Sequence, residues 1–249
     1  MFRALLLPLL ILAAPAAAEG WRATYTITAA GLPVLDAELR FNLDGPAYEV
    51  ESRVQTRGLA RLVMGGEQVA RSRGAWQGSE PRPAVHESEG VWRGAPRRTH
   101  LEYGRDGNPR IVRLEPAEDM PRTPVPPEAR PGTIDTLSAL LLLARRVRDT
   151  ERCDARTRGF DGRRLTQFDV VGEPPASAAE AGLLRCVIES RALAGYALDR
   201  DPEEARAPLR TVALFGRIAP DAPPVPLRVE LASRWWGRIE ARLTGLSRL

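Results

Sequence analysis

The stretch WRATYTITAAGLPVLDAELRF, residues 21–41, decides the fold class of this chain. Apolar and polar side chains alternate in it twice, over residues 21–29 and again over residues 35–41, with Gly31 and Pro33 in the turn between. Alternation with a period of two is typical of a β-strand that has one face in the core and one in water. A sheet with one wet face is expected to be antiparallel.

The same pattern continues along the chain. Residues 48–56 alternate after a turn at residues 44–46, so the first three strands are predicted to form a meander. An apolar piece at residues 59–64 suggests one helical turn, and residues 116–131, with six prolines, suggest a loop. Further strands are predicted at residues 68–76, 85–92, 97–103, 111–114, 163–171, 183–193, 211–218, 227–233 and 238–246.

One strongly apolar helix is predicted to begin near Ile134, with Thr133 or Asp135 as its capping residue. Apolar residues, including Leu137 and Leu141, cover most of its sides, so it is expected to be buried against the concave face of the sheet. The predicted fold class is mainly β: a single curved antiparallel sheet or half-open barrel wrapped around one buried α-helix.

The first 18 residues have the pattern of a secretory signal peptide. A positively charged start is followed by an apolar run over residues 4–14, and Ala16 and Ala18 supply small residues before Glu19. We expect a signal peptide over residues 1–18, cleavage between Ala18 and Glu19, and one β domain over residues 19–249. The apolar run is too short for a stable anchor, so a periplasmic protein with no transmembrane segment after cleavage is predicted.

Two cysteines, Cys153 and Cys186, are present in the whole chain. An even pair in an oxidising compartment predicts a disulfide. The alternative is a metal or redox pair, but the chain has no C-x-x-C motif and only His86 and His100 as imidazole ligands. No metal site and no cofactor are therefore expected.

The charge of the chain argues against one class of partner. A formal net charge of +4 is too small to imply a nucleic-acid partner. All 36 basic residues are Arg, which fits either the codon bias of a GC-rich genome or recognition of phosphate and carboxylate groups. In the absence of Lys, no lysine base or Schiff-base nucleophile can act here.

Four short motifs, taken in order, give the chain a resemblance to a known family. The motifs are Thr56-Arg57-Gly58-Leu59, Ile134-Asp135-Thr136-Leu137-Ser138-Ala139-Leu140, Gly159-Phe160-Asp161-Gly162-Arg163-Arg164, and Arg185-Cys186 ahead of Leu193-Ala194-Gly195. On these motifs the chain resembles the DUF3108 family of uncharacterised bacterial exported proteins over nearly all of the mature sequence. The resemblance implies no activity, but the overall shape of the family is similar to that of periplasmic lipoprotein-carrier folds.

Catalytic motifs are missing from the sequence, and we predict that the chain is not an enzyme. It contains no G-x-S-x-G and no Gly-rich phosphate loop, and both histidines are expected on strand surfaces. Asp135 and Ser138 are expected to have structural roles at the start of the helix. In Phe160-Asp161-Gly162, Asp161 is expected to hydrogen-bond its own turn.

Aromatic residues point to a binding role. Trp76 and Trp92 on separate strands, with Leu137 and Leu141 of the helix, are candidates to line a cavity for an apolar ligand, and Trp235 and Trp236 add to the aromatic set. The alternative is an ordinary core and rim. The predicted function is a non-enzymatic periplasmic protein that binds an apolar ligand, such as a lipid, or a cell-envelope component.

Two other functions remain open. A structural or adaptor protein would use exposed sheet edges to pair with an envelope protein. A hydrolase, the more remote alternative, would need a cluster of buried carboxylates with perturbed pKa values in a cleft. The sequence does not indicate the oligomeric state.

Overall fold

The computed structural model describes residues 20–233 and 237–249. The expected signal peptide and its cleavage site at Ala18 and Glu19 lie outside the described residues, as do Trp235 and Trp236. Among the helices that are described, none has the length and apolar character needed to cross a membrane.

The described chain is mainly β, and the prediction of a single antiparallel sheet is confirmed. Thirteen strands of the described residues form this sheet, and every strand pairing in it is antiparallel. The strands are β1 (Trp21–Ala29), β2 (Leu32–Phe41), β3 (Ala47–Thr56), β4 (Gly66–Gln77), β5 (Glu80–Trp92), β6 (Ala95–Tyr103), β7 (Pro109–Glu115), β8 (Ala155–Phe160), β9 (Leu165–Glu173), β10 (Leu184–Ala194), β11 (Leu209–Gly216), β12 (Val225–Ser233) and β13 (Gly237–Arg248).

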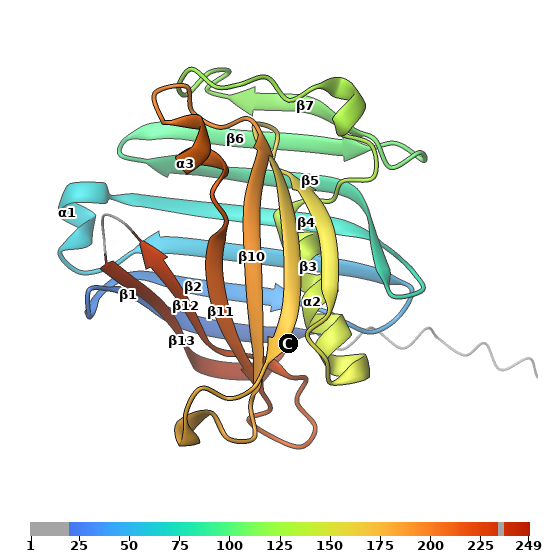
Figure 1. Ribbon diagram of the computed structural model, residues 1–249, viewed down its shortest axis with the longest axis vertical. Coiled ribbons are helices and arrows are strands. Elements are labelled where there is room, and N and C mark those ends of the chain that lie inside the picture. Colours follow the sequence, from blue (N-terminus) through green and yellow to red (C-terminus); the bar gives the residue numbers. More distant parts are fainter. Residues whose placement is uncertain (1–19, 234–236) are drawn as a thin grey trace, which may run out of the picture.

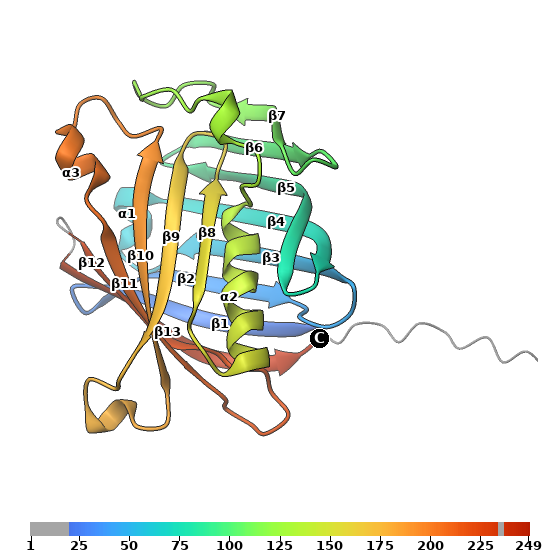
Figure 2. The same cartoon turned by 45° about the vertical axis from the view of Figure 1, so that its right-hand side comes forward.

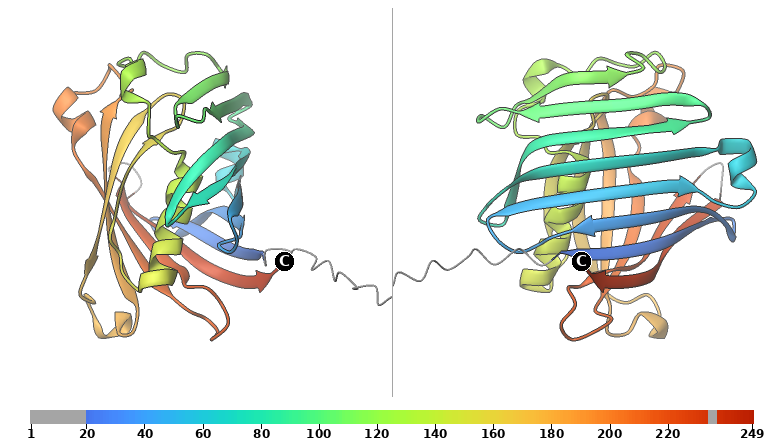
Figure 3. Two further views of the ribbon diagram at one scale, coloured as in Figure 1. Left: turned by 90° about the vertical axis from the view of Figure 1, so that its right-hand side faces the viewer. Right: turned by 180° about the vertical axis from the view of Figure 1, so that it is seen from behind.

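The sheet consists of two meanders that meet at the two ends of the chain. Its strand order is β7-β6-β5-β4-β3-β2-β1-β13-β12-β11-β10-β9-β8 (Figure 1). Trp21 of β1 lies opposite Arg248 of β13, and the N–H of Leu249 donates to the carbonyl of Gly20 at 2.9 Å. The edge strands are β7 and β8, which follow one another in the chain. The sheet curls until it is nearly closed into a barrel (Figure 3).

Helix α2 (Thr136–Thr150) connects the two edge strands. Asp135 caps its first turn, and the helix ends at Glu151, which adopts a left-handed conformation with φ 54°. The helix contacts β3, β4, β5 and β8, beside the concave side of the sheet (Figure 2). Its buried residues are Leu137, Ser138, Leu141, Leu142, Leu143, Ala144 and Val147.

The remaining helices are short. Helix α1 (Ala60–Met64) occupies the apolar piece that was expected to form one turn, and α3 (Pro202–Arg206) was not predicted. Two 3₁₀ turns are present at Pro127–Ala129 and Ala178–Glu180. The first of them interrupts the proline-rich loop after β7.

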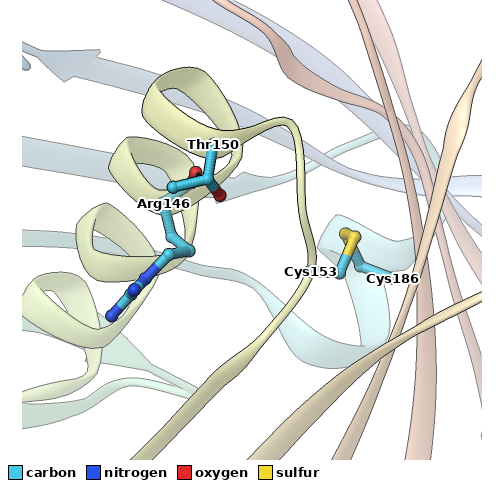
Figure 4. Close-up of a disulfide and its surroundings, with 4 residues drawn as sticks. All are labelled: Arg146, Thr150, Cys153 and Cys186. Carbon is cyan, nitrogen blue, oxygen red and sulfur yellow. Dashed lines mark hydrogen bonds between the residues drawn. A yellow bond between two sulfur atoms is a disulfide. The ribbon is translucent and has the colours of Figure 1, made fainter.

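A disulfide joins Cys153 to Cys186, as predicted, with a Cα–Cα distance of 5.3 Å. Cys153 follows α2 and precedes β8, whereas Cys186 lies in β10 opposite Gly172 of β9. A Cβ added to Gly172 would come within 3.8 Å of the Cys153 side chain. Cys153 therefore lies over β9, and the bond ties the segment after α2 to β10. Figure 4 shows the two cysteines beside the end of the helix.

Candidate functional site

Asp135, the residue that caps α2, is a fully buried carboxylate. Its Oδ1 accepts the backbone N–H groups of Leu137 and Ser138, each at 3.0 Å, which is how the residue caps the helix. Its Oδ2 accepts the hydroxyl of Ser138 at 2.6 Å, and Oδ1 also accepts the hydroxyl of Ser72, on β4, at 2.6 Å. Both oxygens are thus satisfied without water.

Hydrogen bonding keeps this buried group ionised. Burial by itself raises the pKa of Asp135, but hydrogen bonds from His86, Ser138 and Ser72 and the charge of His86 lower it further than burial raises it. The folded protein therefore holds a negative charge in its interior at neutral pH, balanced by donors from β4, β5 and α2.

The donors in this cluster can be assigned from their valences. The single hydroxyl hydrogen of Ser72 points to Asp135, so the Nδ1 of His86, 2.8 Å from the Ser72 Oγ, must donate. Nδ1 also lies 3.3 Å from the Oδ1 of Asp135. The other ring nitrogen, Nε2, forms no hydrogen bond with a described residue. This leaves Nε2 available to a ligand.

Tyr48 extends the cluster to β3. The hydroxyl hydrogen of Ser138 points to Asp135, so the Tyr48 hydroxyl donates to the Ser138 Oγ at 2.8 Å. Burial raises the pKa of Tyr48, which keeps its hydroxyl protonated as a donor. We call Tyr48, Ser72, His86, Asp135 and Ser138 the Asp135 cluster.

A polar cavity of about 400 Å³ lies beside the Asp135 cluster. His86 lines it together with the inner faces of β3 to β6, the start of α2 and the turn that follows β8. The inner face is unusually polar here, because Ser52, Gln68, Ser88 and Thr99 all line the cavity. Gln68 donates to the Ser88 Oγ at 2.6 Å, which leaves the Ser88 hydroxyl hydrogen free to donate elsewhere.

Four arginines and three carboxylates line this cavity: Arg97, Arg98, Arg163, Arg164, Glu115, Asp119 and Asp161. Arg98 is paired with Glu115 at 2.8 Å. Asp119 is held by two hydrogen bonds from Arg122, at 3.0 and 3.1 Å, and these above all lower the pKa of Asp119 to about 2. Arg97 and Arg163 approach the same carboxylate less closely, at 3.7 and 3.6 Å. Arg164 lies 3.4 Å from Asp161.

An apolar cavity of about 230 Å³ lies further along α2. Its walls come from Leu140, Leu141 and Ala144 of the helix and from the inner faces of β1, β2, β12 and β13. Ser52 lines both this cavity and the polar cavity. Ser52 of β3 therefore lies at the boundary between a polar and an apolar part of the sheet interior.

The four residues predicted to line a cavity are not brought together. Leu141 lines the apolar cavity, whereas Leu137 lines the polar cavity. Trp76 packs on Tyr48, with ring centroids 5.1 Å apart, and lies under the guanidinium of Arg145. The ring of Trp92 packs so closely on Gly66 that a Cβ there would collide with it. Neither tryptophan lines either cavity.

The motif around Asp161 forms the turn between β8 and β9. The Oδ1 of Asp161 accepts the N–H groups of Arg163 and Arg164, at 2.8 and 2.7 Å. Gly162 has a φ of 92°, which favours glycine, and Phe160 is buried in the core. This turn presents Arg163 and Arg164 to the polar cavity.

Sequence reasoning missed Ser72, His86, Ser88 and Arg97. The expectation that His86 lies on a strand surface is wrong, because its strand turns His86 and Ser88 inward and Val91 outward. The sequence signal for this was an inverted pattern in β5, in which polar residues face inward and an apolar residue faces outward. His100, in contrast, is half-buried and lies 3.7 Å from Glu87 and from Glu102.

The cluster contains the residue types of a serine-protease triad in a different arrangement. In a triad, histidine lies between serine and aspartate and uses a different ring nitrogen for each. Here Ser72 lies between Asp135 and the Nδ1 of His86 and is fully buried. Among the described residues, no group of three or more His, Cys, Asp or Glu side chains could hold a metal ion.

Comparison with known proteins places the chain in a family. Residues 24–244 match the model of DUF3108, described as a protein of unknown function, and the chain belongs to this family. A search of curated proteins returned no match to the chain. The chain is similar to the crystal structure of a beta-barrel-like protein of domain of unknown function DUF1849 from Brucella abortus. The TM-score is 0.53 and the identity 12%, covering 93% of this chain and 98% of that one. This similarity concerns the fold alone.

Proposed function

We propose that this protein is a non-enzymatic binding protein that takes an apolar ligand, such as an acyl chain, between α2 and the concave face of the sheet. The observation that carries the proposal is the apolar cavity against Leu140, Leu141 and Ala144. This cavity lies between α2 and strands β1, β2, β12 and β13, so a ligand there would bury apolar surface.

The physical argument concerns packing. Protein interiors are close-packed, and voids larger than a water molecule are few. An apolar ligand that fills the partly open cavity of about 230 Å³ therefore gains packing contacts that the empty protein lacks. Transfer of the ligand from water adds roughly 25 cal/mol for each Å² of apolar surface buried.

Two features support action in an oxidising compartment, the periplasm. The Cys153–Cys186 disulfide is of a kind found in exported proteins. Residues 1–18 have the composition of a secretory signal peptide.

The alternatives receive less support. The buried position of Ser72 and its contact with Asp135 oppose hydrolysis by a serine nucleophile. Strand addition to an envelope partner would need a bare sheet edge, but β7 is short and carries Arg110 and Arg113, and charged side chains discourage pairing. Edge strand β8 already bonds to Ile134, whose N–H donates to the Arg158 carbonyl at 3.0 Å.

Filling the apolar cavity tests the proposal. Ala37 lines the cavity on β2, so A37F should abolish the fluorescence enhancement of the neutral probe N-phenyl-1-naphthylamine seen with the wild-type protein. V171F places the same side chain at an exposed position of β9 and should bind like the wild type. A241L is a second filling variant in case A37F does not fold, since Ala241 lines the same cavity.

Two results would contradict the proposal: wild-type protein that does not enhance the probe, or folded filling variants that bind it as well as the wild type. Native mass spectrometry with lipid extraction, on protein purified from the periplasm, would identify the natural ligand.

A further inference from the structure

We propose that the polar cavity binds the anionic head, a phosphate or carboxylate, of an amphiphile whose chain occupies the apolar cavity. This inference rests on the proposed function and names the class of ligand. A protein that bound only a neutral apolar chain would gain nothing from arginines beside the cavity.

The two cavities are neighbours in the fold. Ser52 lines both of them, and its cross-strand neighbour Leu39 lines the apolar cavity. On the helix, Leu137 in the polar cavity and Leu141 in the apolar cavity are one turn apart. A single extended ligand can therefore contact both sets of residues.

The charge balance favours an anion. Arg122 already satisfies Asp119, so Arg97 and Arg163 keep positive charge that this carboxylate does not fully neutralise. Arg97 forms no hydrogen bond with a described residue, and its side chain is 43% exposed. It can therefore move onto a ligand without breaking a hydrogen bond. Guanidinium groups suit phosphate and carboxylate because they donate two parallel hydrogen bonds.

Polar groups within the cavity complete the site. Ser88 can donate its hydroxyl hydrogen, because its oxygen already accepts from Gln68. The ring of His86 is held through Nδ1 by Ser72 and Asp135, which leaves Nε2 for a ligand in a fixed direction. The Asp135 cluster thus orients one wall of the site before any ligand arrives.

Three probes separate a lipid head from a free anion. Dodecyl phosphate has a head and a chain, 1-dodecanol has nearly the same chain without the charge, and inorganic phosphate has the head alone. Each would be titrated by calorimetry into the wild-type protein, below the aggregation concentration of the amphiphiles. R97Q removes the freest guanidinium, and R53Q is its control, because Arg53 is equally exposed on β3 but lines neither cavity.

The wild type should bind dodecyl phosphate more tightly than 1-dodecanol, and inorganic phosphate more weakly than either. R97Q should lower the preference for dodecyl phosphate about tenfold, the value of one charge-assisted hydrogen bond. R53Q should preserve the preference. Added salt should weaken dodecyl phosphate binding more than 1-dodecanol binding.

Equal preference in the wild type and R97Q would overturn the inference while leaving the proposed function intact. Tight binding of inorganic phosphate that A37F leaves unchanged would also overturn it, because the site would then serve a free anion. Failure of every amphiphile to bind would overturn the proposed function itself. R97E, which reverses the charge, distinguishes a weak electrostatic effect from none.

Discussion

A single side chain links the start of α2 to two strands. Asp135 caps the helix through Leu137 and Ser138, and it receives hydrogen bonds from β4 and β5 through Ser72 and His86. Because the cap and the cavity wall share one carboxylate, the position of the helix and the orientation of His86 depend on the same group.

Replacing that carboxylate should destabilise the protein and change its response to acid. D135N should lower the free energy of unfolding by about 3 kcal/mol, because the charge-assisted hydrogen bonds are lost, although the asparagine side chain can still cap the helix. The pKa of Asp135 is lower in the folded protein than its usual 3.8, so its stabilisation is complete above that value. It is lost as the pH falls below 3.8 toward the folded pKa.

The measurement is urea unfolding at pH 7 and at several values below pH 5. The wild type should lose stability over the acid range more steeply than D135N. D154N, a change at an exposed carboxylate, should follow the wild type, because exposed ion pairs contribute little. Parallel acid curves for the wild type and D135N would show that Asp135 does not carry this dependence.

Only part of this cluster could be predicted at the residue scale. Asp135 precedes a helical pattern and is a capping residue type, so its local role follows from the sequence. Its partner Ser72 is 63 residues away, and no local pattern specifies such a pairing. His86 was misplaced because a histidine in a strand is normally assigned to the wet face, whereas the inner face of β5 is polar.

At the scale of elements, alternation was a good guide where the inner face is apolar. Strands β1 to β3 alternate clearly, and their predicted ranges agree with the structure to within a few residues. Strand β8 was missed because Thr157 and Gly159 share its inward face, and glycine weakens the strand pattern. Its pairing with β9 and with Ile134 makes up for that weak local preference.

The disulfide fixes one end of α2, and its removal should reveal how much that tether stabilises the fold. The two cysteines are 33 residues apart, so reduction should cost about 4 kcal/mol in the free energy of unfolding. Thermal unfolding with and without dithiothreitol measures this loss.

The matched control is the double variant Cys153→Ala, Cys186→Ala, which should resemble the reduced wild type and not respond to dithiothreitol. Labelling of the unfolded, unreduced wild type with a thiol reagent should give no signal. A free thiol there would contradict the bond.

At the scale of the whole molecule, the sheet leaves β7 and β8 unpaired with each other while α2 lies beside its concave side. The sequence predicts a curved antiparallel sheet and a helix, because hydrophobic periodicity reports on single elements. It does not predict that β1 pairs with β13, since the alternation of each strand is compatible with many neighbours. The positions of the two cavities depend on how elements distant in the sequence pack together, so the sequence pattern alone does not predict them.

The pairing of β1 with β13 has a consequence for the order of folding. Trp21 lies opposite Arg248, so this ladder closes a loop of almost the whole chain and forms only after the rest is available. Each of the two meanders, in contrast, is built from neighbouring strands. Contacts between distant residues slow folding, so β1–β13 docking should be the slow step.

A circular permutant tests this order. A chain that starts at Gly132, continues to Leu249, and is joined by a short Gly/Ser linker to Gly20 would end at Pro131, so that every ladder would join strands adjacent in the chain. The carbonyl of Gly20 already accepts the N–H of Leu249, so the linker needs to span little distance. The permutant should keep the fold and refold faster than the parent in stopped-flow experiments. An unchanged rate would place the slow step elsewhere.

The pairing of β1 with β13 also means that the strands of a chain still being synthesised do not all have their partners at the same time. Strands β2 to β7 can pair as they appear, whereas β1 keeps one edge without its partner until the last strand arrives. During that interval the exposed edge of β1 is open to association with other chains. Any chaperone that assists this protein should therefore protect its first strand for longest.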